Sequence, residues 1–302
     1  MKQRVITGAI MGLVLIPLLI FNELLYVYQI LMMGLFLIGS NEMVNLYNKE
    51  KKTHIGIRIL IITMSSLIYL AVFSYCVQGG YLLNDVKVVN SVVDFFNSNI
   101  GLVPAISICL LGFFAALVFV PNFGGEEIGH ALTNICYTGV CFGALTALRY
   151  FGIGSLVYVL MVTTFTDIFA YFGGYLFGKH KMAPTISPKK TWEGAIVGST
   201  VATVCATLFA YFYADMFGGV GSLFHQIRIF ETDLGGWLLP CILLITLAIS
   251  VCGQIGDLVA SKLKRTYDIK DYGNLFPGHG GVMDRFDSAL FAAIIVIIFI
   301  LI

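Results

Sequence analysis

The residues of this chain that could carry out chemistry are concentrated between positions 254 and 287, the densest polar stretch of the sequence. Asp257 lies near the end of one long apolar run, and Asp284 and Asp287 lie at the start of the next. In a helix, a spacing of three places the last two on the same side. Carboxylates without cysteine or clustered histidine favour Mg²⁺ over zinc. We therefore expect the three aspartates to hold a divalent cation, with room for a second; the alternative for Asp284 and Asp287 is ion pairing with Arg285.

The segment Phe276–Gly281, FPGHGG, lies between these aspartates. Its three glycines permit positive φ angles and a close approach of the backbone to a ligand. Exposed N–H groups of Gly280 and Gly281 could therefore hold an anion. His279 has two interpretations, donation to a phosphate or stabilisation of the turn, and both stay open.

A second polar segment, SPKKT at residues 187–191, comes directly before another apolar run. The start of a helix with hydroxyl groups and lysines nearby suits a phosphate group. The candidate phosphate ligands are Ser187, Lys189, Lys190 and Thr191. The alternative is that the lysines only mark the cytoplasmic end of an apolar helix.

Two carboxylates lie inside apolar runs, Asp167 within residues 153–178 and Glu42 within residues 25–47. A carboxylate at that depth is costly, so each is a candidate functional residue. The alternative for Asp167 is a buried hydrogen bond to a neighbouring helix.

These side chains must be positioned by apolar helices. Of the 302 residues, 58% are hydrophobic and 12% are charged, and the mean hydropathy is +0.90. Soluble proteins carry about 25% charged residues, whereas runs of about 20 apolar residues cross the roughly 30 Å hydrocarbon core of a bilayer. The chain is therefore predicted to be an all-α, polytopic integral membrane protein. It has no basic face large enough for nucleic acid.

About nine transmembrane helices are predicted, and eight is the alternative because the fifth and last runs are weak. The runs are 5–22, 25–47, 56–78, 101–121, 131–149, 153–178, 194–217, 236–258 and 288–302. Residues 1–150 hold about five of them. Residues 151–302 form the part expected to be catalytic, with cytoplasmic loops 179–193 and 259–287.

The distribution of basic residues predicts the orientation. With the N-terminus in the cytoplasm, 15 Lys and Arg residues fall on the inside, and only Lys87, Arg149 and Arg228 fall outside. Positive charge is retained on the cytoplasmic side. The candidate site is therefore expected at the cytoplasmic face.

The stretch from Ser261 to Asp287 resembles the signature of the phosphatidate cytidylyltransferases, also called CDP-diacylglycerol synthases. That signature combines an initial Ser-x-apolar-Lys-Arg, a central Lys-Asp and Gly, a Phe-Pro-x-His-Gly-Gly turn and a final Asp-Arg-x-Asp. The matching polar, glycine and proline residues are Ser261, Lys264, Arg265, Lys270, Asp271, Gly273, Pro277, His279, Gly280, Gly281, Asp284, Arg285 and Asp287. The SPKKT segment and residues 167–171 also resemble upstream motifs of the family, whereas the first 150 residues match only in hydropathy.

This resemblance implies an enzyme that joins CTP and phosphatidic acid to give CDP-diacylglycerol and pyrophosphate. It implies that Asp257, Asp284 and Asp287 hold Mg²⁺, and that basic residues neutralise the substrate phosphates. Those basic residues are Lys189, Lys190, Lys264, Arg265, Lys270 and Arg285. Asp167 would orient a lysine or reach the metal through water. A homodimer and a bacterial inner membrane are also implied.

Two other classes of protein compete with this interpretation. A transporter would place polar residues along a pathway near the membrane midplane, whereas this chain gathers them at one face. Another CTP-dependent lipid phosphotransferase, such as a polyprenol kinase, is the closer alternative. A CDP-alcohol phosphotransferase would need an Asp-Gly-x-x-Ala-Arg run, which the sequence lacks.

Overall fold

The computed structural model describes residues 12–49, 53–77, 91–121, 123–217, 221–226, 229 and 234–301. Within this part of the chain, seven helices are long and apolar enough to cross a membrane. They are Asn22–Tyr47, Ile55–Cys76, Leu102–Phe119, Gly125–Phe151, Ile153–Phe177, Trp192–Tyr211 and Gly235–Thr266. The prediction of an all-α, polytopic membrane protein is confirmed at this level.

These seven helices match the second to eighth predicted runs. The first run, 5–22, lies partly outside the described residues, although residues 12–20 are helical. The last run lies in α13 (Met283–Leu301), whose first turns carry three charged residues and which is therefore not among the seven. The total of nine stays a prediction.

The orientation also stays a prediction. Of the basic residues predicted to be cytoplasmic, Lys2, Arg4, Lys51 and Lys52 lie outside the described residues, as do Lys87 and Arg228, which were predicted to be on the outer side. Arg149, expected in an outer loop, is instead fully buried and donates from Nη2 to Asn22 Oδ1 at 2.9 Å.

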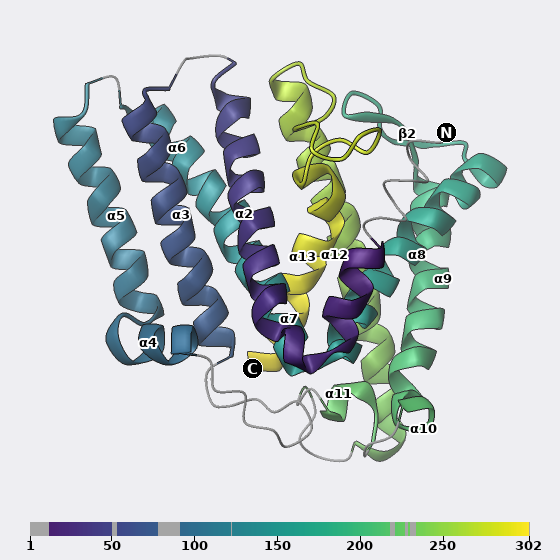
Figure 1. The fold of residues 1–302 in the computed structure, drawn as a ribbon. Helices are drawn as coiled ribbons and strands as arrows, with labels where there is room; N and C mark the ends of the chain where they lie inside the picture. Colours follow the sequence, from purple (N-terminus) through teal and green to yellow (C-terminus); the bar gives the residue numbers. More distant parts are fainter. Residues whose placement is uncertain are drawn as a thin grey trace. The chain divides into compact units, whose positions relative to one another are not determined.

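The chain divides into two compact units (Figure 1). Unit 1 contains the described residues up to Tyr150 together with Thr266–Arg285, and unit 2 contains Phe151–Arg265 and Phe286–Ile302, of which Ile302 is not described. Each unit is therefore built from segments that are distant in the sequence.

Unit 1 is made of helices before Tyr150 and the segment that returns to them. The helices are η1 (Asn22–Leu24), α2 (Leu25–Tyr47), α3 (Ile55–Cys76), α4 (Ser91–Asn99), α5 (Leu102–Phe119), α6 (Gly125–Asn134), the π-helical η2 (Ile135–Val140), α7 (Cys141–Leu148) and η3 (Arg149–Phe151). The helices α6, η2 and α7 run on without interruption and form the single span Gly125–Phe151.

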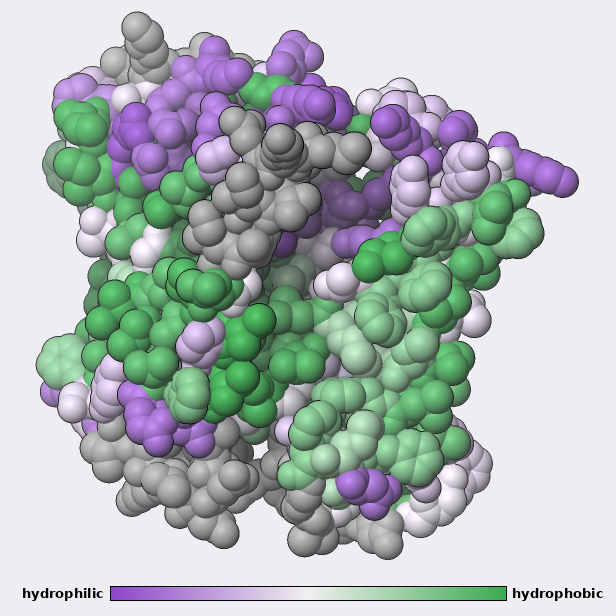
Figure 2. All heavy atoms as spheres, turned by 45° about the vertical axis from the view of Figure 1, so that its right-hand side comes forward, coloured by the Kyte–Doolittle hydropathy of each residue, from purple (hydrophilic) through white to green (hydrophobic). Residues whose placement is uncertain are grey.

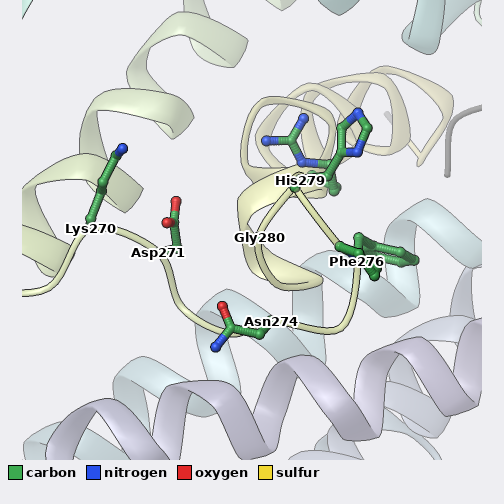
Figure 3. A pocket seen from close by; sticks show the side chains of 9 residues that line it. Lys270, Asp271, Asn274, Phe276, His279 and Gly280 are labelled. Carbon is green, nitrogen blue, oxygen red and sulfur yellow. The ribbon is translucent and has the colours of Figure 1, made fainter. Parts of the chain in front are cut away.

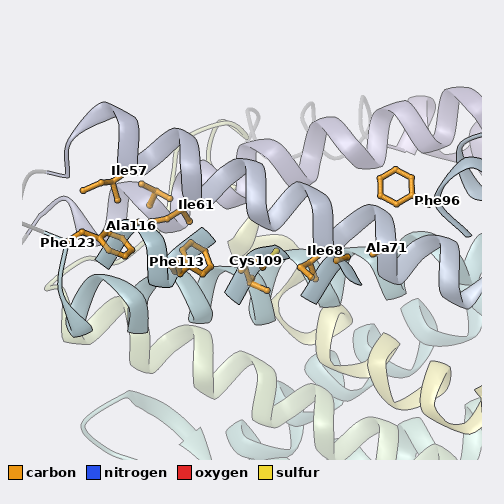
Figure 4. Packing of buried hydrophobic residues seen from close by; sticks show 13 residues of the cluster. Ile57, Ile61, Ile68, Ala71, Phe96, Cys109, Phe113, Ala116 and Phe123 are labelled. Carbon is orange, nitrogen blue, oxygen red and sulfur yellow. The ribbon is translucent and has the colours of Figure 1, made fainter. Parts of the chain in front are cut away.

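The core of unit 1 is a cluster between α3, α5 and α6 (Figure 4). Ile57, Ile61 and Ile68 of α3 repeat at helical spacing, so they lie on one face, as do Cys109 and Phe113 of α5. Between membrane-spanning helices, such contacts stabilise the fold through van der Waals packing rather than through removal of apolar surface from water. Val44 of α2 also belongs to the cluster, so this packing reaches the helix that carries the N-terminal candidate, Glu42.

Unit 2 contains the remaining long helices. They are α8 (Ile153–Phe177), α9 (Trp192–Tyr211), α10 (Tyr213–Phe217), α11 (Leu223–Gln226), η4 (Gly235–Trp237), α12 (Leu238–Thr266) and most of α13. On the face shown in Figure 2, hydrophobic residues cover the sides of the helices and hydrophilic residues gather toward their ends.

The helices α8 and α9 of unit 2 approach each other closely. A Cβ atom at Gly194 or Gly198 of α9 would lie 2.5 Å from the carbonyl oxygen of Ala170 or Thr166 in α8. Small residues allow helix backbones to come this close within a membrane. Hydroxyl groups also link the helices, as in the 2.7 Å contact of Thr166 Oγ1 with Ser250 Oγ of α12.

The predicted loop 179–193 is instead mostly an antiparallel hairpin. Strands β1 (Lys181–Ala183) and β2 (Ser187–Thr191) pair Lys181 with Thr191 and Ala183 with Ser187. Thr191 also caps α9, because its Oγ1 accepts a hydrogen bond from Gly194 N at 3.2 Å. The hairpin therefore holds the SPKKT segment in one conformation at the start of α9.

The predicted loop 259–287 is shorter than expected at both ends. Helix α12 continues to Thr266, and α13 begins at Met283. Hydropathy detects the end of an apolar run, whereas Lys264 and Arg265 are good helix formers that interact favourably with a helix C-terminus. Ser261 and Lys264 therefore lie on α12, one and two turns beyond Asp257.

Candidate active site

The segment that joins α12 to α13 in unit 1 forms a tight turn. Phe276 N donates to Gly280 O at 2.9 Å, and His279 N donates to Phe276 O at 2.7 Å. Gly278 and Gly280 have φ angles of 77° and 84°, which non-glycine residues rarely adopt. The glycine pattern is therefore explained by the turn, and the backbone of His279 belongs to it.

The carboxylate of Asp284 holds the same segment in place through hydrogen bonds to its backbone. Its side chain is 8% exposed, and Oδ2 accepts hydrogen bonds from Tyr272 N at 2.8 Å and Gly281 N at 3.0 Å. The N–H group of Gly281, expected to face an anionic ligand, is thus bonded to this aspartate.

A pocket of about 560 Å³ lies on this turn (Figure 3). Its lining consists of Lys270, Asp271, Asn274, Phe276, Pro277, Gly278, His279, Gly280 and Arg285. Figure 3 shows the chain running from Lys270 past Asn274 to Gly280 and on into the start of α13. Two cations, an amide and an imidazole around one cavity suit a polar, anionic ligand. Of the predicted binding residues, the pocket brings together Lys270, His279, Gly280 and Arg285.

Unit 2 holds a second set of candidates, centred on Asp257. Its Oδ2 forms an ion pair with Lys190 Nζ of β2, and its Oδ1 accepts a hydrogen bond from Ser261 Oγ at 3.3 Å. Both members of the pair are about three-quarters shielded from solvent. The hairpin lysine and the helix aspartate, 67 residues apart, are therefore brought together.

Two further carboxylates belong to this set. Asp257 and Asp167 lie near enough to Asp287 to repel it electrostatically, and Lys264 is near enough to attract it. Asp287 Oδ1 also accepts a hydrogen bond from Ser288 N at 2.8 Å. Asp167 of α8 lies inside the span Ile153–Phe177, as predicted, and it is exposed within unit 2 rather than buried against a neighbouring helix. Its place near Asp287, together with Asp257, makes it a site residue.

A pocket of about 430 Å³ joins these residues in unit 2. Its lining consists of Asp167, Ala170, Tyr171, Gly174, Tyr175, Lys181, Met182, Lys189, Lys190, Thr191, Ala195, Gln254 and Asp257. Lysines and carboxylates thus share the cavity with apolar side chains of α8. A ligand with a charged head and an apolar body matches this combination.

Three predicted binding residues have structural contacts. Ser187 pairs with Ala183 in the hairpin, and Thr191 is the buried cap of α9. Arg265 Nε donates to Ile186 O, at the tip of the hairpin, at 3.4 Å. These residues hold the hairpin in place beside the cavity.

The carboxylates predicted to hold a metal ion are those of Asp257, Asp284 and Asp287. No group of three His, Cys, Asp or Glu side chains within the described ranges is arranged as a metal site. The carboxylates of Asp257 and Asp287 in unit 2, and Asp284 in unit 1, nevertheless offer hard oxygen ligands of the kind that Mg²⁺ takes. The residues fit the ion in chemistry, and ligation by this trio stays a prediction.

The whole chain, residues 2–302, matches the family model described as the cytidylyltransferase family. The chain belongs to that family. The predicted resemblance is thereby confirmed.

Curated relatives of this cytidylyltransferase share much of its length. It is 35% identical to the phosphatidate cytidylyltransferase of Bacillus subtilis over 301 residues, covering 96% of this chain and 94% of the relative. It is 30% identical to that of Staphylococcus saprophyticus, covering 96% and 95%. It is 34% identical to that of Staphylococcus haemolyticus, covering 64% and 67%. The likeness therefore extends beyond the signature into the first 150 residues.

Glu42, which the sequence marked as a candidate functional residue without naming a partner, lies at the signature of this cytidylyltransferase. Its Oε1 accepts a hydrogen bond from Val282 N, and its Oε2 from Met283 N, each at 3.0 Å. The available signal was a lone glutamate inside an apolar run.

Proposed function

We propose that this chain transfers the cytidylyl group of CTP to phosphatidic acid, giving CDP-diacylglycerol and pyrophosphate. The observation that carries the proposal is the complete 261–287 signature in a chain whose relatives over nearly their full length are named phosphatidate cytidylyltransferases. The chain is thus a nucleotidyltransferase of phospholipid biosynthesis.

In this reaction, a phosphate oxygen of the lipid attacks the α-phosphorus of CTP. The bond between the α-phosphorus and the oxygen that bridges to the β-phosphorus breaks, and pyrophosphate leaves with that oxygen. Both reactants are anions, so the main tasks of the protein are to reduce their repulsion and to align them.

The lysine-lined pocket of unit 2 suits the lipid phosphate. Lys181, Lys189 and Lys190 supply positive charge, and Tyr171 and Tyr175 supply apolar surface beside it. Asp257 orients Lys190 through their ion pair. The polar pocket of unit 1 suits the phosphates of the nucleotide, with Lys270 and Arg285 as the neutralising groups.

Asp257, Asp284 and Asp287 are the residues that would hold Mg²⁺. When bound, the ion supplies positive charge that stabilises the pyrophosphate leaving group. The carboxylates of Asp257 and Asp287 already repel each other, and a divalent cation would relieve that repulsion.

The membrane arrangement that serves this reaction has nine helices and a cytoplasmic N-terminus. Residues 12–20 and α13 add two helices to the seven apolar spans. The basic hairpin and the 261–287 signature then face the side that contains CTP. The relatives are bacterial, which favours the inner membrane of a bacterium; a homodimer is the assembly that the family resemblance implies.

The test uses the purified full-length chain in detergent with labelled CTP, phosphatidic acid and Mg²⁺. Release of pyrophosphate that requires the lipid, with CDP-diacylglycerol as the second product, is the expected result. Release of CDP with phosphorylation of a polyprenol would identify the kinase instead. If neither product forms, both enzyme activities are excluded.

A further inference from the structure

The carboxylate of Glu42 organises the signature segment from the N-terminal part of the chain. Glu42 lies on α2 and is 6% exposed. Its two oxygens accept hydrogen bonds from consecutive backbone N–H groups, those of Val282 and Met283. Those N–H groups belong to the start of α13, where helix amides lack partners within the helix. Glu42 therefore caps α13 from another helix, 240 residues away in the sequence.

The segment before α13 is shaped to receive this carboxylate. A Cβ atom at Gly273 or at Gly281 would overlap Glu42 Oε1. These two positions thus require glycine because the glutamate occupies the space of a side chain. Two glycines of the signature are explained by one residue outside it.

Glu42 also lies close to the aspartate that follows the turn. Asp284 is near enough to interact with Glu42 electrostatically, and it bonds the N–H groups of Tyr272 and Gly281. The two carboxylates together hold four backbone N–H groups between residues 272 and 283. The orientation of Asp284 and Arg285 in the first turn of α13 depends on this arrangement.

The other end of the segment is also attached to N-terminal helices. Tyr267 OH lies 3.0 Å from His130 Nε2 of α6, and the ring of His130 stacks on Tyr47 of α2 with centroids 4.1 Å apart. The segment 267–283 is therefore fixed at both ends within unit 1. Its shape is determined by α2 and α6 rather than by its own turn alone.

From these contacts we propose that Glu42 is a positioning residue for cytidylyl transfer: it holds the start of α13 so that Asp284 and Arg285 are aligned for the reaction. Glu42 is not among the residues that line either of the two pockets described above. The kinetic part of this proposal rests on the proposed function. The contact between Glu42 and the two amides can be measured whether or not that function is correct.

The experiment compares Glu42→Gln with Glu127→Gln in the full-length protein. Glu127 is a matched control because its carboxylate also accepts from a backbone N–H at a helix start, that of Gly124 at 2.8 Å, in α6. Glutamine replaces one of the two carboxylate oxygens with an NH₂ donor, so one of the two backbone N–H groups loses its acceptor and the charge is lost as well. We expect Glu42→Gln to lower kcat about 100-fold, the order expected of a misplacement near 1 Å, with a much smaller change in the KM for CTP. Glu42→Asp, which keeps the charge, should recover part of the rate.

Hydrogen exchange gives a readout that does not depend on activity. In Glu42→Gln, the amides of Val282 and Met283 should exchange about tenfold faster through the loss of a charge-assisted hydrogen bond, and in Glu127→Gln they should not. Wild-type turnover in Glu42→Gln, or equal kcat losses in the two variants, would overturn the proposal. Absence of lipid-dependent pyrophosphate release from the wild type would overturn the proposed function alone, because the exchange result would still stand.

If the Glu42→Gln variant does not fold, the Gly273→Ala variant provides a second test of the proposed role of Glu42. The added Cβ would displace the Glu42 carboxylate. The control is Gly34→Ala, which adds a Cβ to α2, the helix that carries Glu42, at a position with no atom within 4 Å. A loss of kcat in Gly273→Ala but not in Gly34→Ala supports the proposal. Equal rates in both would reject it.

Discussion

At the scale of single residues, the carboxylates of the candidate site have different environments. Asp284 is buried and bonded to two amides, whereas Asp257 is paired with Lys190. The spacing of the aspartates predicted a group with one role. The structure instead gives each a separate set of partners, and these differences lead to different expected results on substitution.

Asp284→Asn should abolish turnover and leave the protein folded. The amide oxygen can still accept from Tyr272 N and Gly281 N, but the charge is lost, and with it the predicted metal ligand. A loss of at least about 1000-fold in kcat is expected, the size found when a group acting on developing charge is removed. Asp94→Asn, at an exposed position of α4, is the control. Wild-type rates in Asp284→Asn would remove this residue from the metal site.

Lys190→Ala should weaken substrate binding. Removal of the cation leaves Asp257 unpaired beside Asp287, so the local charge becomes more negative and phosphate groups are repelled. We expect an increase of about tenfold in KM for phosphatidic acid, comparable to one charge-assisted hydrogen bond. Lys179→Ala removes a neighbouring lysine that is not part of the pocket lining. Unchanged kinetics in Lys190→Ala would leave this lysine with only a topological role.

At the scale of elements, the sequence predicts the apolar helices well and the polar connections poorly. Hydropathy is local, so each run from 25 to 258 coincides with one of the seven helices, although α12 ends at Thr266 instead of 258. The hairpin β1–β2 was missed because Lys181–Ala183 and Ser187–Thr191 are short and charged, without the alternating pattern of a half-buried strand. Pairing between such strands depends on neighbours that no local pattern encodes.

The candidate site shows the same limit. The signature predicts the tight turn, because glycines at 278 and 280 are needed for its positive φ angles. It does not predict the contact with Glu42, since a separation of 240 residues leaves no periodicity to detect. Nor does it predict that Asp257 pairs with Lys190, because that ion pair is a consequence of hairpin geometry.

The close packing of α8 and α9 gives a prediction about stability. Gly198→Ala should lower the free energy of unfolding by about 1–3 kcal/mol, because the added methyl group overlaps Thr166 O and the helices must separate. Gly129→Ala in α6 meets no atom within 4 Å and should be neutral or slightly stabilising. Thermal unfolding in detergent measures both. Equal midpoints would show that α9 can shift without cost.

At the scale of the whole molecule, the predicted orientation places the hairpin and the 234–237 connection on opposite sides of the membrane. In sealed right-side-out vesicles, a cysteine introduced as Gly236→Cys should react with a membrane-impermeant thiol reagent without permeabilisation. A cysteine introduced as Lys179→Cys should react only after the vesicles are permeabilised. The parent chain with its seven native cysteines supplies the background. The opposite labelling pattern would show that the protein has the reverse of the predicted orientation.

Chelation tests the ion requirement of the whole enzyme. EDTA should abolish nucleotidyl transfer, and Mg²⁺ in excess should restore it, because oxygen ligands bind this ion reversibly. Calorimetry of Mg²⁺ binding should lose its signal in Asp257→Asn. Transfer that is undiminished in EDTA would exclude a divalent ion from the reaction.

The amides of Tyr272, Gly281, Val282 and Met283 all have carboxylate partners within the protein. An incoming nucleotide therefore meets a rigid receptor, and little of its affinity is spent on restricting backbone freedom. The heat-capacity change on CTP association should accordingly be small, as for docking into a preformed cavity and unlike coupled folding. Whatever rearrangement accompanies turnover must then arise outside this segment.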